Sequence, residues 1–200
     1  EEGDYLVGAA LTDGKFDVML FSSEGKAVRF AEEEVRAMGR QAAGVRGMRL
    51  PEGGGHRVVC MLAAYDESKT VLTATENGFG KRTPIGEYTR HGRGGQGMIA
   101  IQTSDRNGAV VGAVLADDSD EVMLISTGGV LIRTRVDQLR EQGRSTQGVT
   151  LIALGEGEKL AGVERIVERD EDEGGSGGDK GNGGEGATEP FDPPPAPTVH

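Results

Sequence analysis

Arginine residues recur at fixed places along this chain, and the guanidinium group defines the chemistry that they could perform. Arg29, Arg82 and Arg133 each follow an equivalent valine by eleven residues, and three more follow an equivalent glycine: Arg40, Arg93 and Arg144. A guanidinium carries a permanent charge and a fork of N–H donors that matches a carboxylate or a phosphate. The recurrence therefore predicts either repeated internal bonds or a row of phosphate-binding groups.

Two interpretations of these arginines are open. In the structural interpretation, each one bonds a carbonyl or carboxylate between neighbouring units. In the functional interpretation, repetition places the arginines along a continuous rim that follows a phosphate backbone. Other basic residues lie close to them in the sequence and add to the positive charge there. Few aromatic residues accompany them, which favours duplex DNA held by its backbone over stacking on single strands. The candidate DNA-binding residues are Arg29, Arg40, Lys81, Arg82, Arg90, Arg93, Arg133, Arg135, Arg140 and Arg144.

No pattern in the chain predicts catalysis. His56 and His91 are isolated, and no Cys or His pair has the spacing of metal ligands. Glycine-rich stretches such as 53–55 lack the Lys-Ser/Thr pair of a phosphate-binding loop. The acidic residues at 117–121 are typical of a solvated turn. We therefore expect no catalytic residue, no metal site and no cofactor in this chain.

The elements that must position the arginines come from a repeat of about fifty residues. Val18, Val71 and Val122 begin segments that match without a gap, and a turn glycine follows each valine by seven residues: Gly25, Gly78 and Gly129. The copies span about 5–51, 57–102 and 109–153. Self-similarity at such a period is the signature of propellers and solenoids.

The sequence pattern of each unit predicts four short strands. Two of them flank the turn glycine as a tight hairpin, an apolar run such as 6–11 precedes them, and a last run lies around Met48 or its equivalents. Four strands per unit is the count of a propeller blade. Residues 31–38 have helical composition, but the aligned copy contains Pro84 and Gly86, so we predict an extended connection with at most one turn.

The sequence thus predicts an all-β chain with about three blades in residues 1–167. Closed propellers have roughly four to eight blades, so these would be part of a larger disc. The run 160–167 resembles the first strand of a fourth unit, and we expect it to complete a blade begun elsewhere. Residues 168–200 hold nine acidic residues, eight glycines and five prolines, and they predict a disordered tail.

The charge of the chain is unevenly distributed. The tail contributes −7 of the net −11, so a basic stripe on the folded part is compatible with the acidic total. The longest apolar stretches, about eight residues, are too short to span a bilayer, so we expect a soluble cytoplasmic protein with no membrane partner. Cys60 lies in an apolar run and predicts a buried, reduced thiol.

Several segments of the repeats resemble the C-terminal domain family of bacterial DNA gyrase A subunits. The resemblance covers residues 1 to about 168, and the strings that carry it include Thr75–Thr83, Glu121–Ile125, Leu131–Val136 and Gly143–Val149. It implies a six-bladed β-pinwheel whose basic perimeter wraps duplex DNA and supports ATP-dependent negative supercoiling by a type II topoisomerase. This chain would then be the last three blades, half of the disc, followed by the acidic tail.

The resemblance also implies partners that lie outside the chain. These are the N-terminal part of the A subunit, which carries the catalytic tyrosine, and a B subunit, which carries the ATP and Mg²⁺ site, in an A2B2 assembly. The Gln-Arg-Arg-Gly-Gly-Lys-Gly box of the family's first blade is absent, and the nearest string is 91–97. We therefore expect the chain alone to bend DNA poorly.

Two alternatives remain open at this level. The first is the corresponding domain of topoisomerase IV, which shares the blade and would be distinguished by the upstream blades. The second is a propeller that binds proteins or peptides through its central face. Such a face would carry aromatic or polar clusters on its loops, and the chain has no Trp and only three Tyr.

Overall fold

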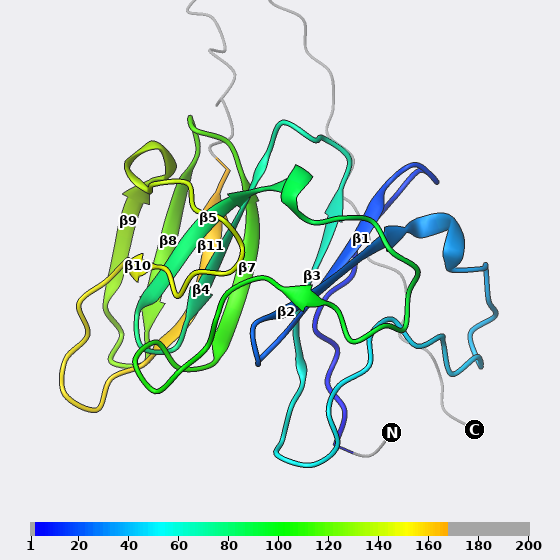
Figure 1. Ribbon diagram of the computed structural model, residues 1–200, viewed down its shortest axis with the longest axis horizontal. Helices are drawn as coiled ribbons and strands as arrows, with labels where there is room; N and C mark the ends of the chain where they lie inside the picture. Colours follow the sequence, from blue (N-terminus) through cyan, green and yellow to red (C-terminus); the bar gives the residue numbers. More distant parts are fainter. Residues whose placement is uncertain (1–2, 168–200) are drawn as a thin grey trace, which may run out of the picture. The chain divides into compact units, whose positions relative to one another are not determined.

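The computed structural model describes residues 3–167, which form three antiparallel sheets and no α-helix (Figure 1). The predicted all-β class is confirmed, and the predicted disordered tail at 168–200 lies outside the described residues. The helices in the described part are three-residue 3₁₀ turns, so none of them could cross a bilayer.

Each repeat contributes a hairpin at the predicted place. The turn glycines have positive φ, +80° at Gly25, +81° at Gly78 and +83° at Gly129, a conformation that glycine adopts without steric cost. The hairpins pair antiparallel in register and comprise β1 (Asp17–Ser22) with β2 (Lys26–Ala31), β4 (Thr70–Thr75) with β5 (Phe79–Pro84), and β8 (Glu121–Ser126) with β9 (Leu131–Arg135).

The other strands of each sheet come from later repeats. The first strand of each hairpin pairs with an inner strand of the next unit: β3 (Val58–Ala64), β7 (Val110–Ala116) or β11 (Leu160–Ile166). Two hairpins also gain a short outer strand, β6 (Met98–Ile99) on β2 and β10 (Val149–Thr150) on β5. The strand orders are β3-β1-β2-β6 in sheet A, β10-β5-β4-β7 in sheet B and β11-β8-β9 in sheet C.

This exchange of strands corrects the expectation that each repeat folds into its own four-stranded blade. Sheet A, for example, combines a hairpin of the first repeat with two strands of the second. The repeat period identifies which segments are equivalent, but it is the same whether a segment pairs within its unit or with the neighbouring one. The pairing is therefore decided by tertiary packing.

Three further expectations were wrong for the same reason. The run 160–167 does not complete a blade begun elsewhere, because β11 pairs with β8 and completes sheet C. The run 6–11 is not a strand: Leu6 is 87% and Leu11 99% exposed. The segment around Met48 is also not a strand, and Met48 instead packs against Val28 and Phe30.

The connection after each hairpin matches its prediction. It begins with one 3₁₀ turn, closed by a bond from a backbone N–H to a carbonyl three residues earlier, and then continues in extended conformation. The three turns are η1 (Glu32–Glu34), η2 (Ile85–Glu87) and η3 (Val136–Gln138). The extended connection with a single turn is confirmed at 31–38.

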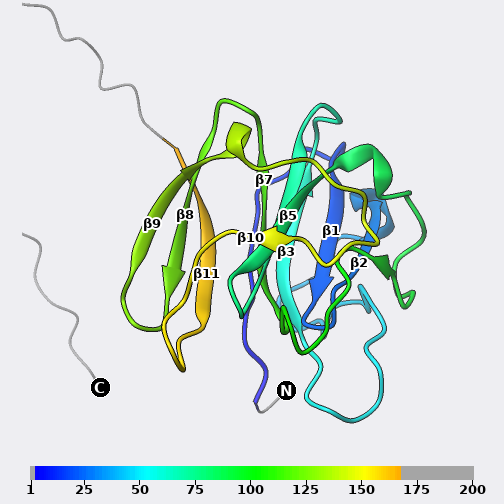
Figure 2. The same cartoon turned by 60° about the vertical axis from the view of Figure 1, so that its left-hand side comes forward.

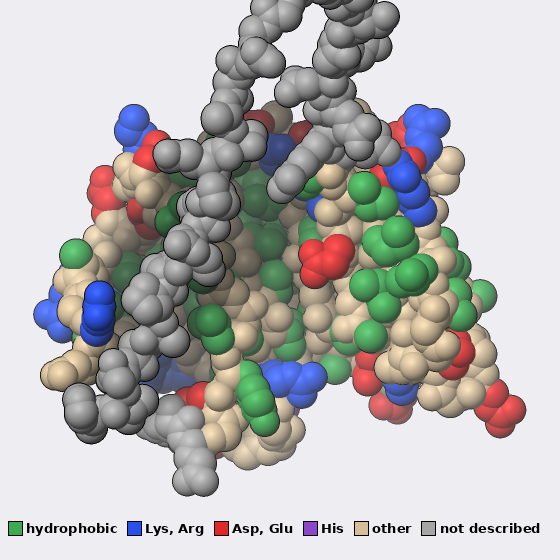
Figure 3. Space-filling view, turned by 180° about the vertical axis from the view of Figure 1, so that it is seen from behind, with side chains coloured by type: hydrophobic (Ala, Val, Ile, Leu, Met, Phe, Trp, Pro, Cys, Tyr) green, Lys and Arg blue, Asp and Glu red, His purple; other side chains and the backbone are tan. Residues whose placement is uncertain are grey.

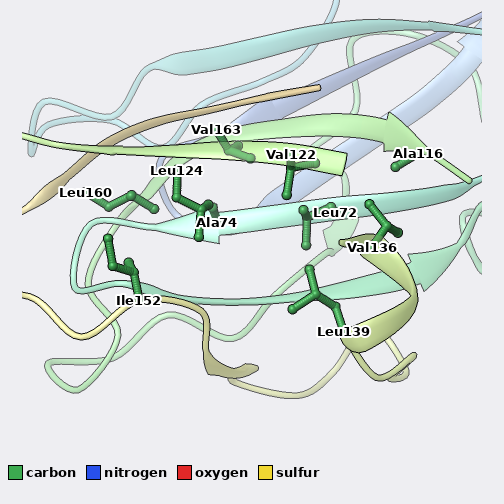
Figure 4. Packing of buried hydrophobic residues seen from close by; sticks show 10 residues of the cluster. All are labelled: Leu72, Ala74, Ala116, Val122, Leu124, Val136, Leu139, Ile152, Leu160 and Val163. Carbon is green, nitrogen blue, oxygen red and sulfur yellow. The ribbon is translucent and has the colours of Figure 1, made fainter. Parts of the chain in front are cut away.

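Apolar side chains fill the spaces between neighbouring sheets. Leu72 and Ala74 of sheet B pack on Val122 and Leu124 of sheet C, and Leu160 of β11 closes one end of the cluster (Figure 4). Met19 and Phe21 of sheet A contact Val71 and Tyr88 in the same way. Burying one such aliphatic side chain stabilises the fold by about 1.5–3 kcal/mol. The sheets are therefore held together by apolar packing between blades.

The inner strands lie beside one another. β7 contacts both β3 and β11, which places these three strands toward the centre, and in each sheet the hairpin's second strand (β2, β5 or β9) lies on the far side of the first strand from them. In Figure 2, β9 and β2 lie at opposite sides of the view. The outward face of sheet C carries apolar groups, with Leu131 61% exposed, and hydrophobic side chains gather on that side of the molecule in Figure 3.

Cys60 of β3 is a free, half-buried thiol whose Sγ lies 3.1 Å from the carbonyl oxygen of Ala113. Burial raises the pKa of this thiol, which keeps it protonated and unreactive near neutral pH.

Gly148 explains why a glycine recurs before each outer strand. Its φ is +78°, and a Cβ there would lie 2.4 Å from the carbonyl oxygen of Gly80, where the outer strand meets β5. We expect Gly148→Ala to lower the free energy of unfolding by about 2 kcal/mol more than the control Gly157→Ala. Gly157 has a φ of +76° but nothing within 4 Å of the added Cβ. Urea unfolding measures both, and equal losses would contradict the close approach.

Candidate nucleic-acid interface

The outer perimeter of the described chain is built from three equivalent segments, residues 32–52, 85–102 and 136–153, which we call the perimeter connections. The second follows the outer edge of β2: the N–H of His91 donates to Arg29 O (2.8 Å) and that of Ala100 to Gly25 O (2.8 Å). The third follows β5 in the same way, from Gln142 to Leu151. In Figure 2 it is the yellow segment that passes in front of β5.

The three perimeter connections also contact one another in sequence order. Between the first and second, the N–H of Arg49 donates to Gly95 O (2.8 Å) and that of Gly94 to Gly47 O (2.6 Å). Between the second and third, the N–H of Gln102 donates to Thr146 O (2.9 Å). The connections therefore form one continuous outer strip.

Five of the predicted arginines lie on this strip with their side chains accessible, including Arg90, whose ion pair is described below. Arg40, Arg93 and Arg140 are exposed, one on each connection, and Arg144 is half-buried. Arg93 donates to the carbonyl oxygens of Glu34 (3.0 Å) and Arg46 (3.2 Å). Arg144 donates to Ile99 O (3.0 Å). These bonds join one connection to the next. The Arg93 side chain remains exposed, whereas Nε of Arg144 is buried without a hydrogen-bond partner and only part of that guanidinium reaches the surface.

Three predicted residues are buried instead: Arg29, Lys81 and Arg82, which are 6%, 1% and 7% exposed. Arg29 Nη1 donates to the carbonyl oxygens of Ile85 (3.1 Å) and Tyr88 (3.2 Å), and its Nε to the buried Asp17 (2.7 Å). These bonds are those of the structural interpretation. A buried guanidinium whose donors are engaged cannot reach a phosphate without breaking them, so we leave these three residues out of the proposed DNA contacts.

The contact made by Arg82 repeats that of Arg29 one unit later. Its Nε donates to Leu139 O (2.5 Å), the equivalent of Tyr88, and its guanidinium pairs with Asp118, as that of Arg29 pairs with Glu67. Burial alone lowers the pKa of Arg29, but the hydrogen bonds with Glu67 and Asp17 outweigh it and raise the pKa. Arg29 therefore stays charged, and both arginines join consecutive repeats.

Lys81 lies on the opposite face of β5 from Arg82. Its Nζ donates to the carbonyl oxygen of Gly143 (2.5 Å) and to that of Arg144. Burial lowers the pKa of Lys81 to about 8; the carboxylate of Glu87 opposes this shift, and the charge of Arg144 adds to it.

The remaining predicted residues lie elsewhere or are paired. Arg90 is exposed and forms an ion pair with Asp17 Oδ1 (2.7 Å). Arg133 and Arg135, on β9, pair with Glu121 and Asp137 and line a pocket with Arg165 at one end of sheet C. The structure does not bring this group onto the outer strip, and contact of Arg133 and Arg135 with DNA stays a prediction.

Three further exposed arginines on the first perimeter connection were not among the predicted residues: Arg36, Arg46 and Arg49. Arg36 recurs as Arg140 in the third repeat, whereas the positions of Arg46 and Arg49 hold residues such as Ile99 and Gln102 in the second. The match to Arg140 could have identified Arg36, and local charge without recurrence could have identified the other two.

Acidic residues accompany these arginines. The three perimeter connections together contain eight arginines and seven acidic residues, so their combined net charge is close to zero. Affinity for a polyanion must then come from the placement of individual guanidinium groups, and we expect it to be modest. In the part of the chain that the structure describes, no three His, Cys, Asp or Glu side chains are grouped so that they could hold a metal ion.

A family model described as "DNA gyrase C-terminal domain, beta-propeller" matches residues 17–61, 69–117 and 120–166. Each matched segment begins at a hairpin and ends in the inner strand that completes its sheet. The chain is 56% identical over 168 residues to the DNA gyrase A subunit of Pseudomonas aeruginosa and 49% identical over 167 residues to that of Escherichia coli K12. Both alignments cover 84% of this chain, which spans about a fifth of the length of these relatives (18% and 19%).

Solved structures show the same fold. A DNA gyrase A C-terminal domain superposes with a TM-score of 0.71 at 28% identity, covering 76% of this chain and 51% of that one. The C-terminal domain of DNA topoisomerase IV gives 0.73 at 27% identity, covering 78% and 48%. The two scores do not distinguish between these domains.

Proposed function

The chain belongs to the DNA gyrase C-terminal domain family, and from this we propose that it is a DNA-wrapping module of a type II topoisomerase. The family model and the gyrase A relatives support gyrase over topoisomerase IV, whose C-terminal domain shares the fold at a comparable identity to the solved gyrase domain. In this proposal the chain holds duplex DNA on the outer strip and performs no chemistry of its own.

The observation that carries the proposal is the continuity of the outer strip. The perimeter connections are hydrogen-bonded to one another in order, and each presents an exposed arginine: Arg40, Arg93 or Arg140. Guanidinium groups spaced along a convex edge are suited to following the phosphates of a bent duplex. Because such contacts reach the backbone and not the base edges, binding would carry little sequence information.

The strip has no feature for binding single strands. Tyr88 is the one aromatic residue in the perimeter connections, and its side chain is fully buried between sheets A and B. Base stacking on aromatic rings, which dominates the binding of single strands, is therefore not provided there.

The rest of the assembly follows from the relatives. We infer that the module acts with two partners, the N-terminal part of an A subunit plus a B subunit, in an A2B2 enzyme located in the cytoplasm. ATP and Mg²⁺ would be bound by those other parts. The share of the relatives that the chain covers, about a fifth, leaves room for the parts that would cleave DNA.

A binding titration with linear duplex DNA at several salt concentrations tests the proposal. Two to four phosphate contacts predict a slope of log affinity against log salt of about −2 to −4, at about 0.9 per phosphate. A single strand of the same length should bind more weakly. A flat salt response, or preference for the single strand, would contradict the proposal and favour a propeller that binds proteins or peptides.

A further inference from the structure

β5 carries a buried lysine that the other hairpins lack. Lys81 is one of the largest fully buried side chains among the described residues, and the equivalent positions hold Val28 and Ile132. Burying an ammonium ion is costly unless polar partners compensate it. The hydrogen-bond acceptors of Lys81, Gly143 O and Arg144 O, both lie in the third perimeter connection.

Three consecutive residues of β5 hold the backbone of that connection. Thr83 Oγ1 donates to Gln142 O (2.8 Å), Lys81 Nζ donates to Gly143 O and Arg144 O, and Arg82 donates to Leu139 O. Because these carbonyl groups are turned inward toward β5, the conformation of residues 142–144 is fixed from inside the molecule.

The second perimeter connection is held differently. There the residue equivalent to Lys81 is Val28, which has no donor, and the guanidinium of Arg93 itself bonds the carbonyls of Glu34 and Arg46. In the third connection Lys81 holds the backbone, and Arg144 makes a single bond to Ile99 O while its N–H is held by Glu87 Oε2 (3.1 Å). The two bonds that Lys81 donates to the third connection therefore have no counterpart at Val28, and the Gly143–Arg144 backbone is held by β5 in a way that the Gly92–Arg93 backbone is not.

We propose that Lys81 is a positioning residue for DNA binding: it fixes the Gly143–Arg144 backbone so that the Arg144 guanidinium is presented on the outer strip to a phosphate of the duplex. The proposal rests on the proposed function. Lys81 itself is too deeply buried to contact DNA, so its effect must pass through Arg144.

The test uses the full chain with Lys81→Met, Arg144→Ala and the double variant, and Lys15→Met as a control with the same change of charge at an exposed site. Without DNA, Lys81→Met should speed amide hydrogen exchange at residues 143–147 about tenfold and leave β4 and β7 unchanged. Affinity for duplex DNA at low salt should fall about fivefold in Lys81→Met. The double variant should bind no more weakly than Arg144→Ala alone, because the two residues act as one unit.

Several results would overturn the role of Lys81. These are unchanged DNA affinity in Lys81→Met, losses that add fully in the double variant, or an equal loss in Lys15→Met. If Lys81→Met does not fold, amide hydrogen exchange is measured in the unmodified chain instead. Exchange at residues 143–147 as fast as in an unstructured peptide would overturn the proposal. If the unmodified chain bound no duplex DNA, the proposed function would fail together with this role, whereas retained binding with no effect of Lys81→Met would overturn this role alone.

Discussion

Replacing Arg29 with alanine is expected to lower the free energy of unfolding by about 3–5 kcal/mol, the cost of breaking a buried charge pair. The carboxylate of Asp17, itself only 3% exposed, would lose its bond with Arg29 Nε. The carbonyl oxygens of Ile85 and Tyr88 would lose their donor at the same time, so the junction between the first and second repeats would be weakened along with the hairpin.

Urea unfolding of the whole chain measures this loss, and Arg133→Ala is the matched control. Arg133 occupies the same place in the third repeat, but its side chain is 49% exposed and pairs with Glu121 at the surface. Surface pairs contribute about 0–1 kcal/mol, so the control should remain near the unmodified stability. Equal losses in the two variants would show that burial does not separate the recurrent arginines and would reopen the functional interpretation of Arg29.

Replacing Arg40, Arg93 and Arg140 together with glutamine is expected to abolish most of the binding to duplex DNA. Each lost phosphate contact should reduce the salt slope by about 0.9, so the three together should reduce it by about 2.7. At low salt the affinity should fall on the order of a hundredfold, since exposed ion pairs contribute up to about 1 kcal/mol each. All three side chains are exposed, so the unfolding transition should change little beyond the loss of the two Arg93 bonds to Glu34 O and Arg46 O.

A second triple variant provides the control: Lys15, Arg57 and Arg165 to glutamine. It removes the same charge from exposed positions outside the perimeter connections. If long-range attraction by net charge dominated binding, both variants would lose affinity equally, and the outer strip would have no special role. A loss confined to the perimeter variant supports local contact with phosphates.

The sequence alone predicted the local elements of the fold. The fifty-residue repeat, the hairpins at Gly25, Gly78 and Gly129, and the single turn after each hairpin all follow from local rules, because turn chemistry and strand alternation act over a few residues. The same strings carried the resemblance to the gyrase family. Arg40, Arg93 and Arg140 are exposed on the connections that follow the hairpins, and their contact with DNA stays a prediction.

The partners of the strands could not be predicted in this way. A repeat looks the same after a shift of one unit, so its period cannot tell whether the run 58–64 pairs with its own hairpin or with the preceding one. In the structure each such run pairs with the preceding hairpin: β3 pairs with β1, and β11 pairs with β8. The run 6–11 has no preceding hairpin among the described residues, and it does not form a strand.

The roles of the recurring arginines also depend on the tertiary structure. Their identity and spacing were determined by the sequence, which allowed both internal bonds and phosphate contacts because a guanidinium binds carbonyls, carboxylates and phosphates with the same donors. Only the tertiary structure separates them. Arg29 and Arg82 point between sheets, where desolvation requires that every donor be paired, whereas Arg40, Arg93 and Arg140 lie on the outermost segments, where water leaves the guanidinium available to a ligand.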